Sequence, residues 1–147
     1  MRIPPAGLFL LAAGSQRAFG RLTTPGLIAA APIVLGSAVV GAAAVGGFLR
    51  QGTTVDPVRV GRASSLVTDG VFAVTRNPMY LALAGTLTAH AVARGSGWGL
   101  IPVAGFVTAL NRWQIAAEEK ALERRFGAEY AAYAARVPRW LGLVGAG

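Results

Sequence analysis

A run of 28 residues without a charged side chain separates Arg21 from Arg50. A helix rises about 1.5 Å per residue. Even after a loop start at residues 23–25, the run is therefore long enough for the roughly 30 Å hydrocarbon core of a bilayer. The alternative, a buried helix of a soluble protein, seldom stays uncharged over such a length. The run predicts a membrane span over residues 25–49.

Three shorter apolar stretches predict further spans over residues 3–19, 78–93 and 97–111. The last two are joined by Arg-Gly-Ser-Gly, a short turn segment. The first also has features of a secretory signal peptide, but two prolines stand where its apolar run starts and no small-x-small cleavage site follows. A span is therefore favoured there. Charged residues make up 14% of the chain, against roughly 25% in soluble domains.

The basic residues predict an orientation. With four spans, three of them (Arg17, Arg21 and Arg94) lie on one side and eleven on the other: Arg2, Arg50, Arg59, Arg62, Arg76, Arg112, Lys120, Arg124, Arg125, Arg136 and Arg139. This asymmetry predicts cytoplasmic termini, and we expect a bacterial inner-membrane protein. The net charge of +8 is not gathered into a basic, aromatic-interleaved segment, so no nucleic-acid partner is expected.

Two segments are not predicted to span the membrane. Residues 50–77 form a long polar loop, and loops of this length are usually functional. Residues 112–136 predict an amphipathic cytoplasmic helix, because apolar and charged side chains alternate at helical spacings. The expected fold is thus an all-α integral membrane protein with about four spans in a single domain over residues 1–147.

Chemistry is expected at the cytoplasmic surface. The chain has no cysteine, and its one histidine, His90, is interpreted as interfacial or helix-bonded rather than as a ligand, so no metal site is expected. All six acidic residues fall in the loop and tail. A proton-coupled transporter would normally place an ionisable group inside a span. The acidic residues therefore indicate a polar site where loop and tail meet.

Taken singly, the motifs are unspecific. Asn77 and Pro78 suit the N-cap and first turn of a helix. Glu118 and Glu119 are adjacent, so their side chains point about 100° apart and at most one faces a given pocket.

Together, the motifs resemble a known family. The run SSLVTDGVFAVTRNPMY (residues 64–80), two apolar spans and then EEKALERRFGAEYAAYAARVPRW (residues 118–140) are similar to small bacterial members of the isoprenylcysteine carboxyl methyltransferase family. That family is related to the phospholipid methyltransferases. The resemblance extends from Gly52 to Trp140, and the stretch GTTVDP at its start shares it.

The resemblance implies an intramembrane methyltransferase that uses S-adenosylmethionine. Its substrate would be a lipophilic small molecule or lipid with a carboxylate, thiol or amine acceptor. Glu118 would receive the amino group of the cofactor, and Arg112 and Glu119 are the expected catalytic residues. The remaining cofactor-binding residues implied are Ser64, Ser65, Leu66, Val67, Phe72, Arg76, Asn77, Pro78, Met79 and Tyr80.

The sequence departs from the family pattern at three positions. Asn77 stands where the family usually has histidine, and Ala82 where a glycine commonly follows. Gln114 takes the place of the arginine that contacts the substrate carboxylate in the eukaryotic enzymes, with Arg112 as the nearest basic residue. We therefore expect this chain to share the family's cofactor-binding site more closely than its substrate-binding site. The alternatives are an NADPH-dependent reductase on the related sterol-reductase scaffold and a small four-helix transporter or scaffold.

Overall fold

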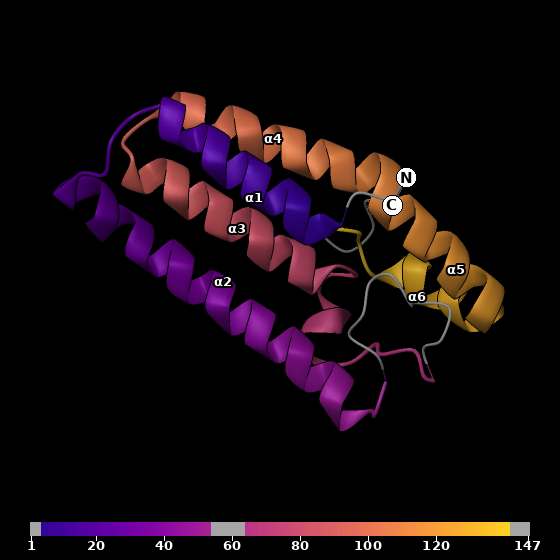
Figure 1. Cartoon of the computed structure of the whole chain (residues 1–147). Coiled ribbons are helices and arrows are strands. Elements are labelled where there is room, and N and C mark those ends of the chain that lie inside the picture. The colour runs from indigo at the N-terminus through magenta and orange to yellow at the C-terminus, as the bar shows by residue number, and fades with distance from the viewer. Residues whose placement is uncertain (1–3, 54–63, 142–147) are drawn as a thin grey trace. The chain divides into compact units, whose positions relative to one another are not determined.

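The computed structural model describes residues 4–53 and 64–141, and within these ranges all regular structure is helical (Figure 1). The elements are α1 (Pro5–Ser15), the 3-10 turn η1 (Gln16–Ala18), α2 (Thr24–Arg50), η3 (Gly70–Ala73), α3 (Pro78–Ala93), η4 (Gly97–Gly99), α4 (Leu100–Ala109), the π-helical η5 (Leu110–Ile115), α5 (Ala116–Phe126) and α6 (Ala128–Arg136). The predicted all-α class is confirmed for this part of the chain.

Helices lie at each of the four stretches expected to span the membrane. Among the described residues, α2 alone is long and apolar enough to cross a membrane by length and composition. Only 17% of its most apolar 18-residue stretch is buried, whereas the core helix of a soluble protein is mostly buried. The number of spans stays a prediction.

The tail differs from the single helix expected over residues 112–136. Residues 110–115 form a π-helical segment that joins α4 to α5, and Gly127 then separates α5 from α6. Gly127 has φ of 50°, a left-handed conformation that glycine adopts without steric cost. The prediction was wrong because the amphipathic spacing continues on both sides of this one residue.

The chain forms two compact units. The first consists of Met1–Val39 and Ala82–Ile115, and the second of Val40–Leu81 and Ala116–Gly147. Both α2 and α3 contribute residues to each unit. The assignment of the whole chain to one domain stays a prediction.

In the first unit, α1 lies beside α4 (Figure 1), where the rings of Phe9 and Phe106 meet edge to face with centroids 6.3 Å apart. Small side chains bring α2 close to α3. Ala30 packs with Ala89 and Ala93, and a Cβ on Gly26 would lie 2.5 Å from the Ala93 carbonyl oxygen. Only glycine fits there.

A polar side chain ties this unit together. Gln16 is fully buried, and its amide nitrogen donates to the carbonyls of Leu87 (2.9 Å) and Gly99 (2.8 Å). Its amide oxygen lies 2.7 Å from Nδ1 of His90. Arg94 donates to the Gln16 carbonyl (3.1 Å). His90 thus contacts a side chain of η1, and its interpretation as interfacial or helix-bonded rather than as a ligand stays a prediction.

The second unit has a mixed apolar and aromatic core that supports the loop after α2. Its buried members are Ala44, Val67, Phe72, Tyr130, Tyr133 and Val137. Phe72, in η3, packs against Phe48 of α2 at 5.0 Å, and its carbonyl accepts a hydrogen bond from the Tyr133 hydroxyl (2.7 Å). Contacts with α2 on one side and α6 on the other therefore hold this loop in place. Most of the GTTVDP stretch lies outside the described residues.

Candidate active site

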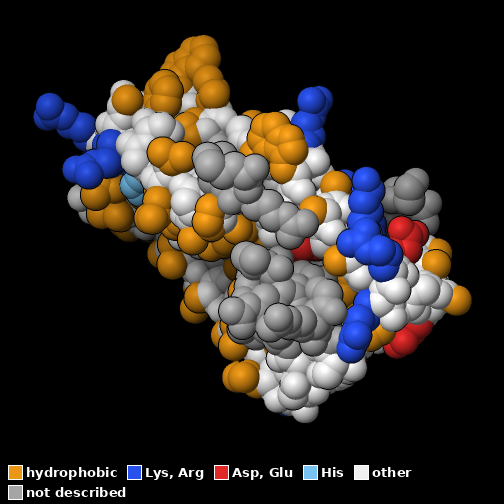
Figure 2. Space-filling model, turned by 45° about the vertical axis from the view of Figure 1, so that its right-hand side comes forward, with side chains coloured by type: hydrophobic (Ala, Val, Ile, Leu, Met, Phe, Trp, Pro, Cys, Tyr) orange, Lys and Arg blue, Asp and Glu red, His pale blue; other side chains and the backbone are white. Residues whose placement is uncertain are grey.

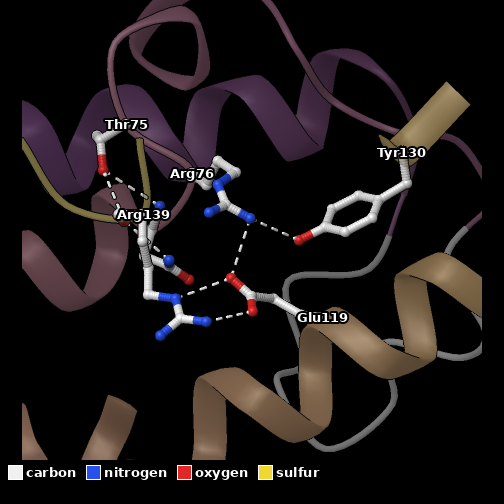
Figure 3. Close-up of polar contacts among 6 residues, drawn as sticks. Thr75, Arg76, Glu119, Tyr130 and Arg139 are labelled. Atoms are coloured by element: carbon white, nitrogen blue, oxygen red, sulfur yellow. Dashed lines mark hydrogen bonds and ion pairs between the residues drawn. The ribbon is translucent and has the colours of Figure 1, made fainter. Parts of the chain in front are cut away.

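The second unit holds a cluster of two arginines around one carboxylate (Figure 3). Nη1 of Arg76 lies 3.0 Å from Oε1 of Glu119. Arg139 binds the same carboxylate with two nitrogens, Nε to Oε1 at 2.9 Å and Nη2 to Oε2 at 2.5 Å. Nη1 of Arg76 also donates to the Tyr130 hydroxyl (3.1 Å). Such bidentate pairing fixes the carboxylate geometrically as well as electrostatically.

The tail after α6 runs along the segment before α3. The backbone N–H of Arg76 donates to the Pro138 carbonyl (2.9 Å). The Arg139 carbonyl accepts from the Asn77 side-chain amide (2.9 Å) and from the Thr75 hydroxyl (3.3 Å). Thr75, which is buried, also accepts from the Asn77 backbone N–H (3.2 Å). Asn77 thus fastens the tail at the mouth of α3.

Glu118 lies beside this cluster on α5 but has a different partner. The hydroxyl of Tyr80, in the first turn of α3, donates to Oε1 of Glu118 at 2.5 Å. Tyr80 is buried, and Glu118 is half-buried. The two adjacent glutamates therefore serve different neighbours, as their angular separation on a helix requires.

The loop residues expected to line a cofactor site fall into three groups. Val67 and Phe72 are 4% and 6% exposed and form core. Leu66 and Met79 pack on that core but stay partly exposed. Of the two serines at the loop start, Ser64 is exposed and bonds back to Gly52 and Thr53, whereas Oγ of Ser65 is buried without a hydrogen-bond partner.

A second buried polar atom also has no partner. It is Nε of Arg76, whose Nη1 binds Glu119 and Tyr130. Buried donors are nearly always hydrogen-bonded in folded proteins. Both atoms belong to residues of the second unit that were expected to bind a cofactor.

Comparisons with known proteins identify the family of this chain. The family model for phospholipid methyltransferase matches residues 26–129, well over half of the chain. The chain belongs to the phospholipid methyltransferase family. This family includes isoprenylcysteine carboxyl methyltransferase-like proteins, so the predicted family is confirmed. A Haemophilus influenzae protein whose name is "Uncharacterized protein" is 41% identical over 63 residues, which are 43% of this chain and all of that protein. No solved structure matches the chain.

The family is one of methyltransferases. Most of the expected site residues lie in the second unit. Arg112 differs from the rest. It lies in η5, within the first unit, and its side chain is exposed. Gln114, two residues on, is buried. The catalytic role expected of Arg112 stays a prediction.

Four residues that contact the expected site residues were not predicted from the sequence: Thr75, Tyr130, Tyr133 and Arg139. Both tyrosines lie within the family-like run over residues 118–140, but the sequence assigned them no partner. Arg139 follows the Val-Pro pair of the family-like tail, and this was the one signal available for it.

The charges of the cluster reinforce each other. The hydrogen bond to Glu119 is the main cause that raises the pKa of Arg139. Burial, followed by the Glu119 charge, raises the pKa of Tyr130. Burial also raises the pKa of Tyr133. The arginine therefore stays a cation and the two phenols stay neutral hydrogen-bonding groups at physiological pH.

Proposed function

We propose that this protein is an integral membrane enzyme that transfers a methyl group from S-adenosylmethionine to a lipophilic small molecule or lipid at the cytoplasmic face of the membrane. The observation that carries the proposal is the Glu118–Tyr80 pair (2.5 Å), which lies in the same unit as two unpartnered buried donors. Membership of a methyltransferase family supports the reaction class. The length and exposure of α2 support a membrane location.

The residues present fit the cofactor. Its methionyl end carries an ammonium and a carboxylate, and its adenine requires an apolar slot with few polar contacts. Glu118 supplies a carboxylate for the ammonium, with Tyr80 holding its orientation. Nε of Arg76 and Oγ of Ser65 supply donors for carboxylate oxygens, and such charge-assisted bonds are the strong ones. Leu66 and Met79, apolar and only partly buried, offer surface for an adenine.

When bound, S-adenosylmethionine supplies a methyl group activated on a sulfonium. The work left to this chain is positioning, because an in-line displacement gains most from held geometry. Glu118 and Arg76 hold the two charged ends apart at fixed places. Val67 and Phe72 act behind them as packing that keeps the loop in place. A carboxylate or thiolate acceptor needs no general base, whereas an amine would.

Calorimetric titration of the detergent-purified protein with S-adenosylhomocysteine tests the cofactor. We expect the wild type to bind, and Glu118→Gln to weaken binding about 10- to 100-fold, as loss of a hydrogen bond to a charged group does. Glu123→Gln, which makes the same change at an exposed position of α5, is the matched control. Absence of binding by the wild type, or equal binding by Glu118→Gln, would overturn the proposal.

Single cysteines test the proposed four-span topology with cytoplasmic termini, because the chain has none of its own. Gly97→Cys should not disturb the fold, since a Cβ at residue 97 meets nothing within 4 Å. A membrane-impermeant maleimide should label it from outside intact cells. Glu129→Cys, also at an exposed residue, should react only after lysis. Equal labelling of both sites would contradict the topology.

A further inference from the structure

We infer that Arg139 is a positioning residue, which fixes α5 to the segment before α3 and so sets the direction of Glu118. The inference rests on the proposed function. Arg139 contacts both elements: its guanidinium binds Glu119 of α5, and its backbone carbonyl accepts hydrogen bonds from Asn77 and Thr75. Arg76, which lies in that segment, also binds Glu119, but through one carboxylate oxygen, whereas Arg139 holds both.

The geometry explains how a residue that does not contact Glu118 can orient it. Adjacent side chains on an α-helix differ by about 100° in direction. Once the carboxylate of Glu119 is held at both oxygens by Arg139 (Figure 3), α5 cannot rotate about its axis without breaking two charge-assisted bonds. Glu118 is then turned to Tyr80. The guanidinium of Arg139 therefore fixes the rotation of α5 about its own axis.

The backbone carbonyl of Arg139 holds the segment that precedes α3. Its carbonyl receives the Asn77 amide, and the Pro138 carbonyl beside it receives the Arg76 backbone N–H. These bonds hold the residues directly before α3, which begins at Pro78 and carries Tyr80 in its first turn. One residue thus constrains Glu118 from its own helix and Tyr80 from the neighbouring one.

The charge balance distinguishes this role from a simple ion pair. Arg76 already neutralises Glu119 (3.0 Å), so the second guanidinium is not needed to balance the carboxylate. What Arg139 adds is the planar two-point grip that an ammonium cannot reproduce. Arg139→Lys, which keeps the charge, should therefore restore only part of what Arg139→Gln loses.

The test is a double-mutant cycle on S-adenosylhomocysteine affinity. Arg139→Gln should weaken binding about tenfold, a size usual for coupled residues in one network. In a Glu118→Gln background the same change should weaken binding less than twofold, because the side chain that Arg139 orients has already lost its charge. A merely structural role would lower affinity by the same factor in both backgrounds.

Arg136→Gln is the matched control, since Arg136 is exposed and its side chain donates to the Ala132 carbonyl of its own helix. It should bind like the wild type. Thermal unfolding of each variant checks that the folded fraction is equal. If the wild type binds S-adenosylhomocysteine and Arg139→Gln binds it equally well, this inference alone is overturned. It is also overturned if Arg139→Gln lowers the affinity by the same factor in the wild-type and Glu118→Gln backgrounds. Absence of wild-type binding overturns the proposed function as well.

Discussion

Gln16 offers a direct measure of how a buried polar residue stabilises the first unit. Its side chain has no exposed surface and makes three hydrogen bonds, to Leu87, Gly99 and His90. Gln16→Leu keeps a similar volume, so loss of these bonds dominates the effect. At about 0.6 kcal/mol for each bond inside a bilayer, or about 0.5–1.5 kcal/mol in a water-exposed fold, the three together contribute about 1.5–4.5 kcal/mol.

Reversible unfolding by SDS in mixed micelles, followed by tryptophan fluorescence, measures this change in the free energy of unfolding. Gln51→Leu is the matched control, because Gln51 is exposed and makes one long bond to Asp69 (3.4 Å). It should change stability by less than about 0.5 kcal/mol, as surface substitutions usually do. A Gln16→Leu cost equal to that of the control would refute the role assigned to Gln16.

Three further predictions concern packing and pH. Tyr133→Phe leaves the Phe72 carbonyl without its 2.7 Å donor and should cost about 1–2 kcal/mol in the same unfolding assay; a cost near zero would contradict this. Gly26→Ala should destabilise by about 1–3 kcal/mol, because the new Cβ meets backbone at 2.5 Å, whereas Gly105→Ala meets nothing and should be close to neutral. Because burial raises the pKa of Tyr130 and Tyr133, the folded chain binds more protons than the unfolded chain above about pH 10. The free energy of unfolding should therefore fall as the pH rises beyond that point, and less steeply in Tyr133→Phe.

The helices were predictable where local signals define both ends. The expected span over residues 78–93 coincides with α3, because a proline fixes its first turn and glycine-rich sequence follows its end. The expected span over 25–49 differs from α2 by one residue at each end, since Arg50 ends the uncharged run. In both cases the information lies within a few residues of the boundary.

The contacts that build the site were not predictable in the same way. Spacing rules describe neighbours three or four residues apart on a helix, whereas Glu119 meets Arg76 43 residues away and Arg139 20 residues away. The resemblance placed Glu119 and Arg76 in the site but could not say that they pair. It also could not show that Phe72 belongs to the core, because an aromatic ring serves as core or ligand surface with the same sequence pattern.

The bonds between the tail and the segment before α3 have a consequence for synthesis of the chain. Asn77 and the Arg139 carbonyl that it binds are 62 residues apart. At about 5–20 residues per second, a ribosome needs roughly 3–12 s to make that interval. During this time α3 can form while the amide of Asn77 and the hydroxyl of Thr75 still lack these acceptors. Nascent chains stopped before Pro138 should therefore contain the helices without these contacts to the tail.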